Sequence, residues 1–226
     1  MFEYYYNHVP GVGLCRNNLV YTSKIDRQNK LFSVHYTYDQ MYHMNKCLSE
    51  DALEIRWQRE IKFTKQMIKS FPEHVLEIKH INMDTREIIF NIKGDDFWQL
   101  ANCNHENYND VLPDWQEQII KILKDYRRAG IWKYSLHPSS FFVVDGKLKN
   151  INHFFCYNDN EQHVAITEVL DHISDDRKDK LLKYLDAKNI QVTDSAPWST
   201  YAQICLESFK SNYPTGFIER AKEIYV

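Results

Sequence analysis

The segment 134-YSLHPSSFFVVDGKLKNINHFF-155 joins a polar stretch containing a proline to two apolar runs that are separated by a tight turn. The runs 141–144 and 147–151 flank the pair Asp145-Gly146, and an Asp-Gly pair between apolar runs is a strong signal for a β-hairpin. Asp145 is the only acidic residue of the segment, and we interpret it as a turn residue rather than a catalytic one. The sequence therefore predicts a hairpin that follows a polar loop poor in carboxylates.

The chain before this segment has the pattern of a small sheet that carries one helix. Apolar residues recur every three or four positions between Ser49 and Phe71, Ser49 is a suitable helix N-cap, and Pro72 ends the repeat. Short runs rich in β-branched and aromatic residues precede and follow the helix, and we expect them to form antiparallel strands. The expected strands are 19–25, 31–38, 74–82 and 86–92.

The second half of the chain is mostly helical apart from the hairpin. Segment 113–130 begins with a proline, ends with a glycine and carries an apolar stripe, as an amphipathic helix does. Residues 93–96 break the pattern and make a plausible linker, so we expect two units, residues 1–94 and residues 95–226. The other expected helices are 95–101, 164–173, 177–189 and 199–226, the last divided near Tyr213-Pro214.

Composition narrows the function classes. A formal net charge of -3 argues against a dedicated nucleic-acid binder, which should show a basic excess. The five cysteines are odd in number and never form a CxxC pair, so neither a disulfide framework nor a zinc motif is predicted and a reducing cytoplasm is favoured. The sequence shows no signal peptide and no apolar run long enough to span a bilayer, so we expect no membrane association.

The order of these elements, together with residues 135–140, resembles the protein-kinase-like fold in its aminoglycoside-phosphotransferase branch. The pattern of that branch is Asp-Leu-His-Pro-Gly-Asn, followed by an apolar strand, a turn and Ile-Asp-Phe. Here the strand is 141–144, the turn is 145–146, the return strand is 147–151, and Asn152 stands at the second Asp. The resemblance extends to the small kinase-like proteins of bacteriophages. It implies an α+β, two-lobed fold with a small antiparallel sheet lobe, one helix and a mostly helical second lobe.

The resemblance also locates the residues that should carry chemistry, and most of them differ. Ser135 stands where the family has its catalytic-loop Asp, and Ser140 and Asn152 stand where it has its two metal ligands. The strand lysine that holds the phosphates falls nearest to His35. Its partner on the helix falls at Glu60, or less well at Glu54.

Each of these differences removes a group on which phosphoryl transfer depends. Phosphoryl transfer depends on neutralising phosphate charge with Mg²⁺ and cationic side chains, and Mg²⁺ prefers carboxylate ligands. Ser140 and Asn152 offer only neutral oxygens, and the hydroxyl of Ser135 stays protonated near neutral pH, so it cannot act as a base.

The histidines leave two interpretations open at one position. His137 either hydrogen-bonds the backbone of its own loop, as the resemblance implies, or acts as a general base with a pKa near neutrality. The remaining histidines form no HExxH motif, and His74 and His80 are expected on one strand face with no third metal ligand nearby.

Three hypotheses follow. The first is a catalytically degenerate kinase-like protein, or pseudokinase, that needs no cofactor and binds a protein partner, a host factor in the host cytoplasm if the phage link holds. The second is a divergent phosphotransferase that uses ATP and Mg²⁺ on a protein or small molecule and recruits Asp95, Asp96 or His137. It requires at least two carboxylates near Asn152. The third is a structural α+β protein whose hairpin matches by chance.

Overall fold

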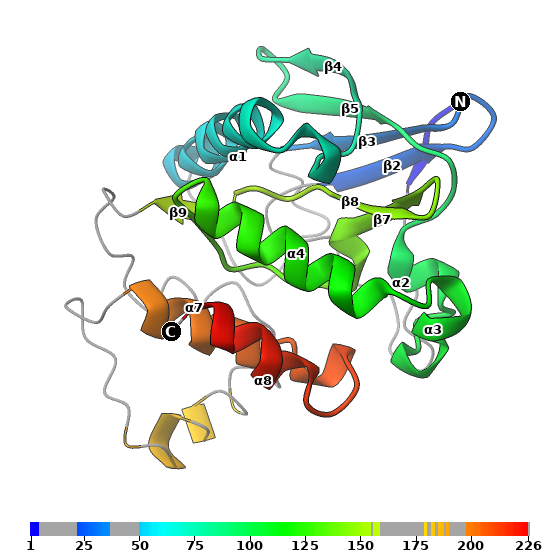
Figure 1. The fold of residues 1–226 in the computed structure, drawn as a ribbon. Helices are drawn as coiled ribbons and strands as arrows, with labels where there is room; N and C mark the ends of the chain where they lie inside the picture. The colour runs from blue at the N-terminus through cyan, green and yellow to red at the C-terminus, as the bar shows by residue number, and fades with distance from the viewer. Residues whose placement is uncertain are drawn as a thin grey trace.

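The computed structural model describes residues 1–4, 22–36, 50–154, 156–158, 179, 182–183, 185–187, 189 and 198–225. The expected helix 164–173 lies outside the described residues, as do part of segment 177–189 and the outer ends of the expected strands 19–25 and 31–38. The protein is α+β: a small antiparallel sheet with α1 beside it, a hairpin crossed by α4, and α7 and α8 on the side of α4 away from α1 (Figure 1).

The sheet is antiparallel and has the strand order β1-β2-β3-β5-β4. Its strands are β1 (Glu3–Tyr4), β2 (Thr22–Asp26), β3 (Leu31–His35), β4 (Ile78–Asn82) and β5 (Glu87–Asn91). Each of the four expected strands has a counterpart, although the expected strand 74–82 is shortened to Ile78–Asn82, and β1 is an addition. The expectation for His74 is wrong: it lies in the short 3-10 helix η1 (Pro72–His74), because Pro72 fixes a turn geometry at its start and strand pairing begins only at Ile78.

The predicted helix is α1 (Glu50–Ser70), and it ends before Pro72 as expected. Trp57 faces the sheet with only 1% of its surface exposed, and its ring lies 5.4 Å from that of Tyr36, which follows β3. Further along the helix, Phe63 and Met67 are fully buried in a second apolar cluster. One helix therefore contributes to both parts of the core.

The hairpin that the sequence predicted consists of β7 (Phe141–Val144) and β8 (Lys147–Asn150), with Val144 paired to Lys147. Asp145 and Gly146 both have positive φ, 53° and 70°, as the tight hairpin turn with two left-handed residues requires. The Asp145 carboxylate pairs with Lys93 at 2.7 Å. Its place in the turn is confirmed.

Helices and two short strands surround the hairpin. The expected helices at 95–101 and 113–130 are confirmed, and the C-terminal segment divides before Pro214 as expected. The elements are α2 (Phe97–Leu100), α3 (Tyr108–Val111), α4 (Trp115–Arg128), β6 (Ile131–Lys133), β9 (Cys156–Asn158), α7 (Trp198–Glu207) and α8 (Phe217–Lys222), with short 3-10 helices at His105–Asn107, Pro138–Ser140, Lys210–Asn212 and Glu223–Tyr225.

The buried side chains form two clusters. One joins the sheet and the first half of α1 to Phe142, Ile151 and Phe154. The other joins α4, the C-terminal helices and the far half of α1. Both the hairpin and α1 therefore take part in both clusters, and the expected boundary between residues 94 and 95 stays a prediction. In the described part of the chain, none of the helices is both long and apolar enough to cross a membrane.

We predict that Trp57→Ala lowers the free energy of unfolding by about 3 kcal/mol or more, because it leaves a large cavity between α1 and the sheet. Denaturant unfolding checks this. Ile55→Ala is the matched control, since Ile55 lies on the same helix with 56% of its surface exposed and its truncation should change stability by less than about 0.5 kcal/mol. Equal losses in the two variants would contradict the packing described here.

Candidate functional site

The polar loop that follows β6 is closed by hydrogen bonds within itself. His137 caps the 3-10 helix at Pro138–Ser140: its Nδ1 accepts the backbone N–H of Ser139 at 3.2 Å and lies 2.7 Å from the Ser139 hydroxyl oxygen. The hydrogen bond from His137 to the backbone of its own loop, one of the two interpretations of this residue, is therefore present. Ser135 is buried in the same loop.

Ser140 and Asn152, the two expected metal-ligand positions, lie side by side. The Asn152 side-chain amide donates to the Ser140 hydroxyl oxygen at 2.7 Å, and the backbone N–H of Ile151 donates to the Ser140 carbonyl at 2.9 Å. Asn152 is 3% exposed and has a φ of 68°, in the left-handed region. Its Oδ1 has no hydrogen-bond partner among the described residues. The structure thus brings these two positions together as a neutral, buried pair.

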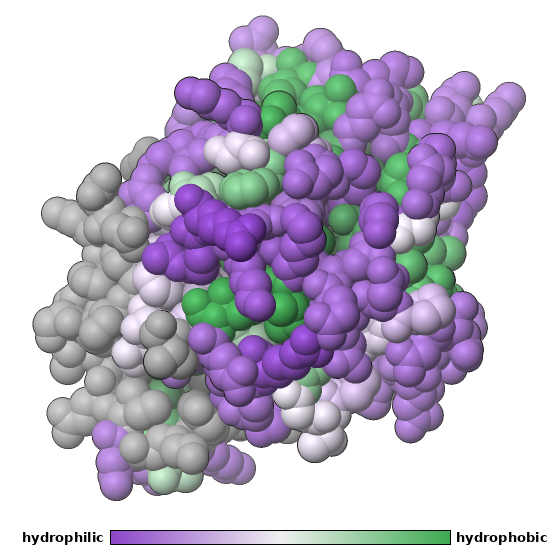
Figure 2. All heavy atoms as spheres, viewed as in Figure 1, coloured by the Kyte–Doolittle hydropathy of each residue, from purple (hydrophilic) through white to green (hydrophobic). Residues whose placement is uncertain are grey.

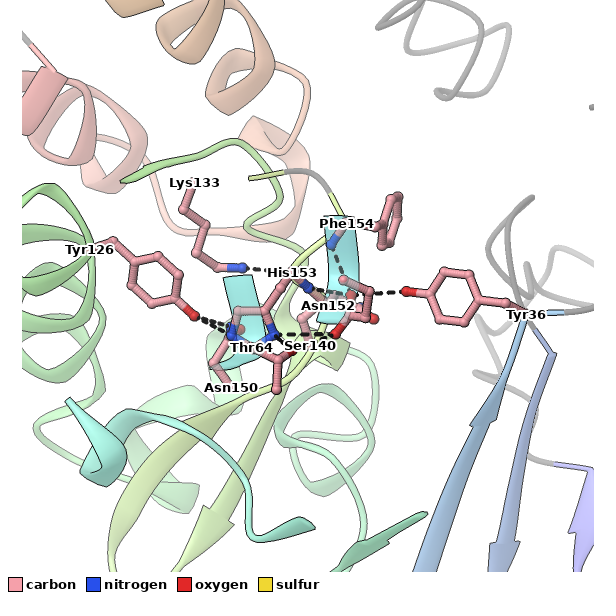
Figure 3. Close-up of polar contacts among 10 residues, drawn as sticks. Tyr36, Thr64, Tyr126, Lys133, Ser140, Asn150, Asn152, His153 and Phe154 are labelled. Atoms are coloured by element: carbon pink, nitrogen blue, oxygen red, sulfur yellow. Dashed lines mark hydrogen bonds and ion pairs between the residues drawn. The ribbon is translucent and has the colours of Figure 1, made fainter. Parts of the chain in front are cut away.

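Glu60 extends from α1 to the chain immediately after Asn152. Its Oε2 accepts the backbone N–H groups of His153 at 2.6 Å and Phe154 at 2.8 Å, and the Tyr36 hydroxyl at 2.9 Å. Its Oε1 accepts from the Thr64 hydroxyl at 3.2 Å. Figure 3 shows these groups converging from the sheet, from α1 and from the hairpin. The carboxylate therefore fastens three separate parts of the chain to one another.

The charge on Glu60 is stabilised despite its burial. Burial alone raises the pKa of this carboxyl group, but the hydrogen bonds from His153 and Tyr36 outweigh that effect, so the pKa of Glu60 is lowered. Two backbone N–H donors aimed at one oxygen form a fixed anion site within the protein.

The residue at the end of β3 that reaches Glu60 is Tyr36, and the assignment of the lysine position to His35 stays a prediction. Side chains alternate along a strand, so neighbouring residues point to opposite faces, and Tyr36 is on the face that packs against α1. His35 is half-buried and is paired with Thr22 and Glu87 in the sheet register. A neutral phenol thus hydrogen-bonds the carboxylate to which the resemblance assigns a lysine partner.

His153 belongs to a buried chain of hydrogen bonds that sequence reasoning missed. Asn150 donates its amide to the Tyr126 hydroxyl oxygen at 2.8 Å, and that hydroxyl lies 2.7 Å from His153 Nε2. His153 Nδ1 lies 3.2 Å from Glu60 Oε1. A neutral ring with its proton on Nδ1 fits these contacts, because Tyr126 then donates to Nε2, and Nδ1 donates to Glu60 and to the Thr64 hydroxyl oxygen, which lies 3.0 Å away. Burial lowers the pKa of His153, against the opposing effect of Glu60.

Lys133 is a second buried group that the sequence analysis missed. It is 0% exposed, and its Nζ donates to the Asn152 carbonyl at 3.2 Å and lies 5.4 Å from the centre of the Tyr126 ring. Burial lowers the pKa of this amine. The available signal was a lysine enclosed by the apolar run Ile131–Tyr134. Its hydrogen bond to the backbone of residue 152 gives it a positioning role.

The other acids that were candidates for catalysis are engaged elsewhere. Asp96 caps α2 by accepting the Gln99 N–H at 3.0 Å, and Asp95 pairs with Arg27 at 2.6 Å. Glu54, the second choice for the helix partner, accepts from Arg86 at 2.8 Å. Among the carboxylates described, the one that hydrogen-bonds the chain next to Asn152 is Glu60.

Within the described ranges, one group of three side chains has the spacing of metal ligands, and it is a different one: Glu73, His74 and Asp125. His74 Nε2 lies 2.8 Å from Asp125 Oδ2, and the Lys121 ammonium lies 2.5 Å from the same oxygen. A cation therefore already neutralises Asp125, and the charge and hydrogen bonds that its neighbours supply lower the pKa of that carboxyl group against the effect of burial.

Comparison with known proteins finds similarity at the level of structure and none at the level of sequence. No protein-family model matches the chain, and no curated protein sequence matches it. The chain is similar to the structure described as "Co-crystal structure of WbdD and kinase inhibitor LY294002", with a TM-score of 0.43 and 9% sequence identity. The similarity covers 86% of this chain and 45% of that chain, so this chain spans less than half the length of that protein.

We predict that stability falls as the pH drops below the ordinary histidine value of 6.5, by up to about 1.4 kcal/mol per pH unit. The unfolded chain takes up a proton on His153 in this range, whereas the native state resists protonation because its pKa is lowered. The loss from Glu60 comes at lower pH, below the ordinary value of 4.5, because its pKa is also lowered. Denaturant unfolding between about pH 7.5 and about pH 5.5 measures the histidine effect.

The variant His153→Gln should lose most of this pH dependence, even though it is less stable at every pH. His80→Gln is the matched control, because it removes an exposed histidine on β4 and leaves the buried network intact. If the two variants keep the same dependence on pH, His153 is not the group that titrates.

Proposed function

We propose that the chain has a two-lobed, protein-kinase-like arrangement and acts as a catalytically degenerate kinase-like protein that binds a protein partner, a host factor if it comes from a bacteriophage. The observation that carries the proposal is the Ser140–Asn152 pair. At the two positions where the kinase-like pattern places metal ligands, the side chains are neutral, buried and hydrogen-bonded to each other. This arrangement holds the loop against the hairpin and provides no carboxylate for Mg²⁺.

The element order supports the proposed arrangement. A small antiparallel sheet with one long helix precedes a short connection at residues 93–96, and α4, a polar loop and a hairpin follow it. The helix partner that the resemblance assigns, Glu60, does lie on α1 and does point to the residues just after Asn152. The positions that the pattern brings together in the sequence are therefore neighbours in space.

The chemistry at these positions favours binding over phosphoryl transfer. Glu60 accepts two backbone N–H groups and a phenol, so its charge is already used inside the protein. The hydroxyl of Ser135 stays protonated at neutral pH, so it cannot act as a general base. A protein with these residues keeps the shape of a kinase-like site without its catalytic groups. Its function is then to bind a partner through a surface formed on that shape.

The alternative is a divergent phosphotransferase that uses ATP and Mg²⁺ on a protein or a small molecule. It requires two carboxylates near Asn152. Glu60 is one, and Asp95 and Asp96, the acids that it would recruit, are held by Arg27 and by the start of α2. The alternative therefore has less support from the described residues than partner binding has.

A thermal-shift titration with ATP and ADP, each with and without Mg²⁺, tests the proposal against this alternative. A ligand at about 100 times its Kd stabilises the native state by about 2.7 kcal/mol, which is easily seen as a rise in Tm. We expect no metal-dependent rise. A rise that needs Mg²⁺ would overturn the proposal and favour the phosphotransferase.

We also predict that Ser135→Ala leaves partner binding within about twofold of the wild type, because the hydroxyl at this position does no chemistry. The measurement is the amount of crosslinked partner that purifies with each tagged chain from the natural host. Asn152→Asp, which places a charge in the buried pair, is the contrasting variant and should lower Tm. A complete loss of binding in Ser135→Ala would point to an active catalytic loop.

A further inference from the structure

Exposed cations gather over the C-terminal halves of α1 and α4. We name this surface the basic face and define it by Lys62, Lys65 and Lys69 on α1 and Lys121, Lys124 and Arg128 on α4. Figure 2 shows hydrophilic residues covering this side of α4, and α1 and α4 lie on the same side of the molecule in Figure 1. The chain as a whole has a net charge of -3, so the concentration of positive charge is local.

The two helices are joined at this face. The side-chain amide of Gln66 on α1 donates to the carbonyl of Ala129, the residue that ends α4, at 2.7 Å. Gln66 lies one turn after Lys62 and one turn before Lys69, so it shares their side of the helix. The lysines of α1 and the cations near the end of α4 therefore border one continuous surface.

Three of these lysines have no ion-pair partner among the described residues: Lys65, Lys69 and Lys124. Lys121 and Arg128 do have one, since both bind the buried Asp125, and Glu73 lies 4.0 Å from Lys121. The side chains of Lys121 and Arg128 are nevertheless 59% and 69% exposed. The face therefore presents more positive charge than its own acids neutralise.

Helix stability accounts for only part of this pattern. Lys69 and Arg128 lie in the last turns of their helices, where a cation interacts favourably with the helix dipole. Lys62 and Lys65 lie farther inside α1, beyond the range of that effect. Like charges three positions apart on one helix face repel each other, so these lysines weaken the isolated helix. A bound anionic group would remove that repulsion.

An exposed apolar side chain borders the basic face. Ile68 is 43% exposed and lies one turn after Lys65 on α1. The apolar stripe of α1, in contrast, is occupied in the core by residues such as Trp57, Phe63 and Met67. Cations beside an exposed apolar side chain complement a ligand that combines carboxylates with an apolar side chain.

We infer that the basic face is the docking surface for an acidic segment of a partner protein, with carboxylates facing the lysines and an apolar side chain against Ile68. The inference rests on the proposed partner-binding function and assigns it a surface. Charge complementarity of this kind speeds encounter and selects the partner, and it weakens as salt screens the charges.

Two other classes of anionic partner fit the face less well. Binding of single-stranded nucleic acid relies on exposed aromatic rings, and the large exposed apolar residues of the described chain include no Trp or Tyr and one Phe, Phe2, outside the basic face. Insertion into an anionic membrane requires a free apolar helix face, and that of α1 is buried in the core.

The test uses the full chain and fluorescence anisotropy with defined probes. The probes are a labelled peptide of about 20 residues with Glu and Leu at helical spacing, the same peptide with Gln for each Glu, a single-stranded DNA of similar length, and vesicles of phosphatidylserine and phosphatidylcholine. The variant carries Lys65→Glu, Lys69→Glu and Lys124→Glu, three positions at which no described ion pair is broken.

The matched control carries Lys30→Glu, Lys79→Glu and Lys147→Glu, which change the net charge equally at exposed positions outside the face. We expect the acidic peptide to bind the wild type and the control equally, and the face variant at least about tenfold more weakly, with salt weakening the wild-type affinity. The Gln peptide should bind poorly. Wild-type binding that the face variant retains, or no binding at about 100 µM peptide, overturns the inference.

Tighter binding of DNA or vesicles through the same three lysines also overturns it, in favour of a nucleic-acid or membrane surface. The proposed partner-binding function and the proposed docking surface can be refuted independently of each other. If the crosslinked cellular partner still binds the face variant, partner binding stands and the docking surface lies elsewhere. If ATP with Mg²⁺ raises Tm, the non-catalytic function fails whatever the peptide does.

Discussion

The structure depends on one buried carboxylate that accepts hydrogen bonds from the backbone. Glu60 receives the N–H groups of His153 and Phe154 and the hydroxyl of Tyr36, and so connects α1, the sheet and the segment after the hairpin. Hydrogen bonds to a charged group are worth about 1.5–3 kcal/mol each, and an unpaired charge at this depth would be strongly destabilising. The geometry of the candidate site is therefore a consequence of holding this charge.

Around Glu60, the polar groups of the site form hydrogen bonds with one another. Asn152 donates its side-chain amide to Ser140, and Lys133 donates to the carbonyl of Asn152. His153 forms hydrogen bonds with Tyr126 and with Glu60. Each contact fixes position. Burial lowers the pKa values of Lys133 and His153, whereas the hydrogen bonds to Glu60 lower its pKa against the effect of burial. Such an interior specifies one conformation of the loop and hairpin.

Much of the fold could be predicted because its signals are local. The Asp145-Gly146 turn, the period of α1 and the proline after it each determine a structure within a few residues. The errors arose where a distant contact decides. His74 was placed on a strand, but Pro72 and the neighbouring Asp125 keep it in a turn. The contact from Tyr36 to Glu60 likewise depends on how the sheet packs against α1, which the local sequence does not show. Lys133 and His153 were missed because only tertiary packing shows that they are buried together.

The left-handed backbone at Asn152 has a consequence for how such a site changes over time. Asn and Asp tolerate positive φ better than other residues with a side chain, and they have nearly the same shape. At this position the charge of the side chain and the path of the backbone are therefore separable. An exchange between amide and carboxylate would change the charge of this buried position while the backbone keeps its left-handed conformation. Because both side chains tolerate this conformation, the backbone here does not restrict which of the two charge states the position carries.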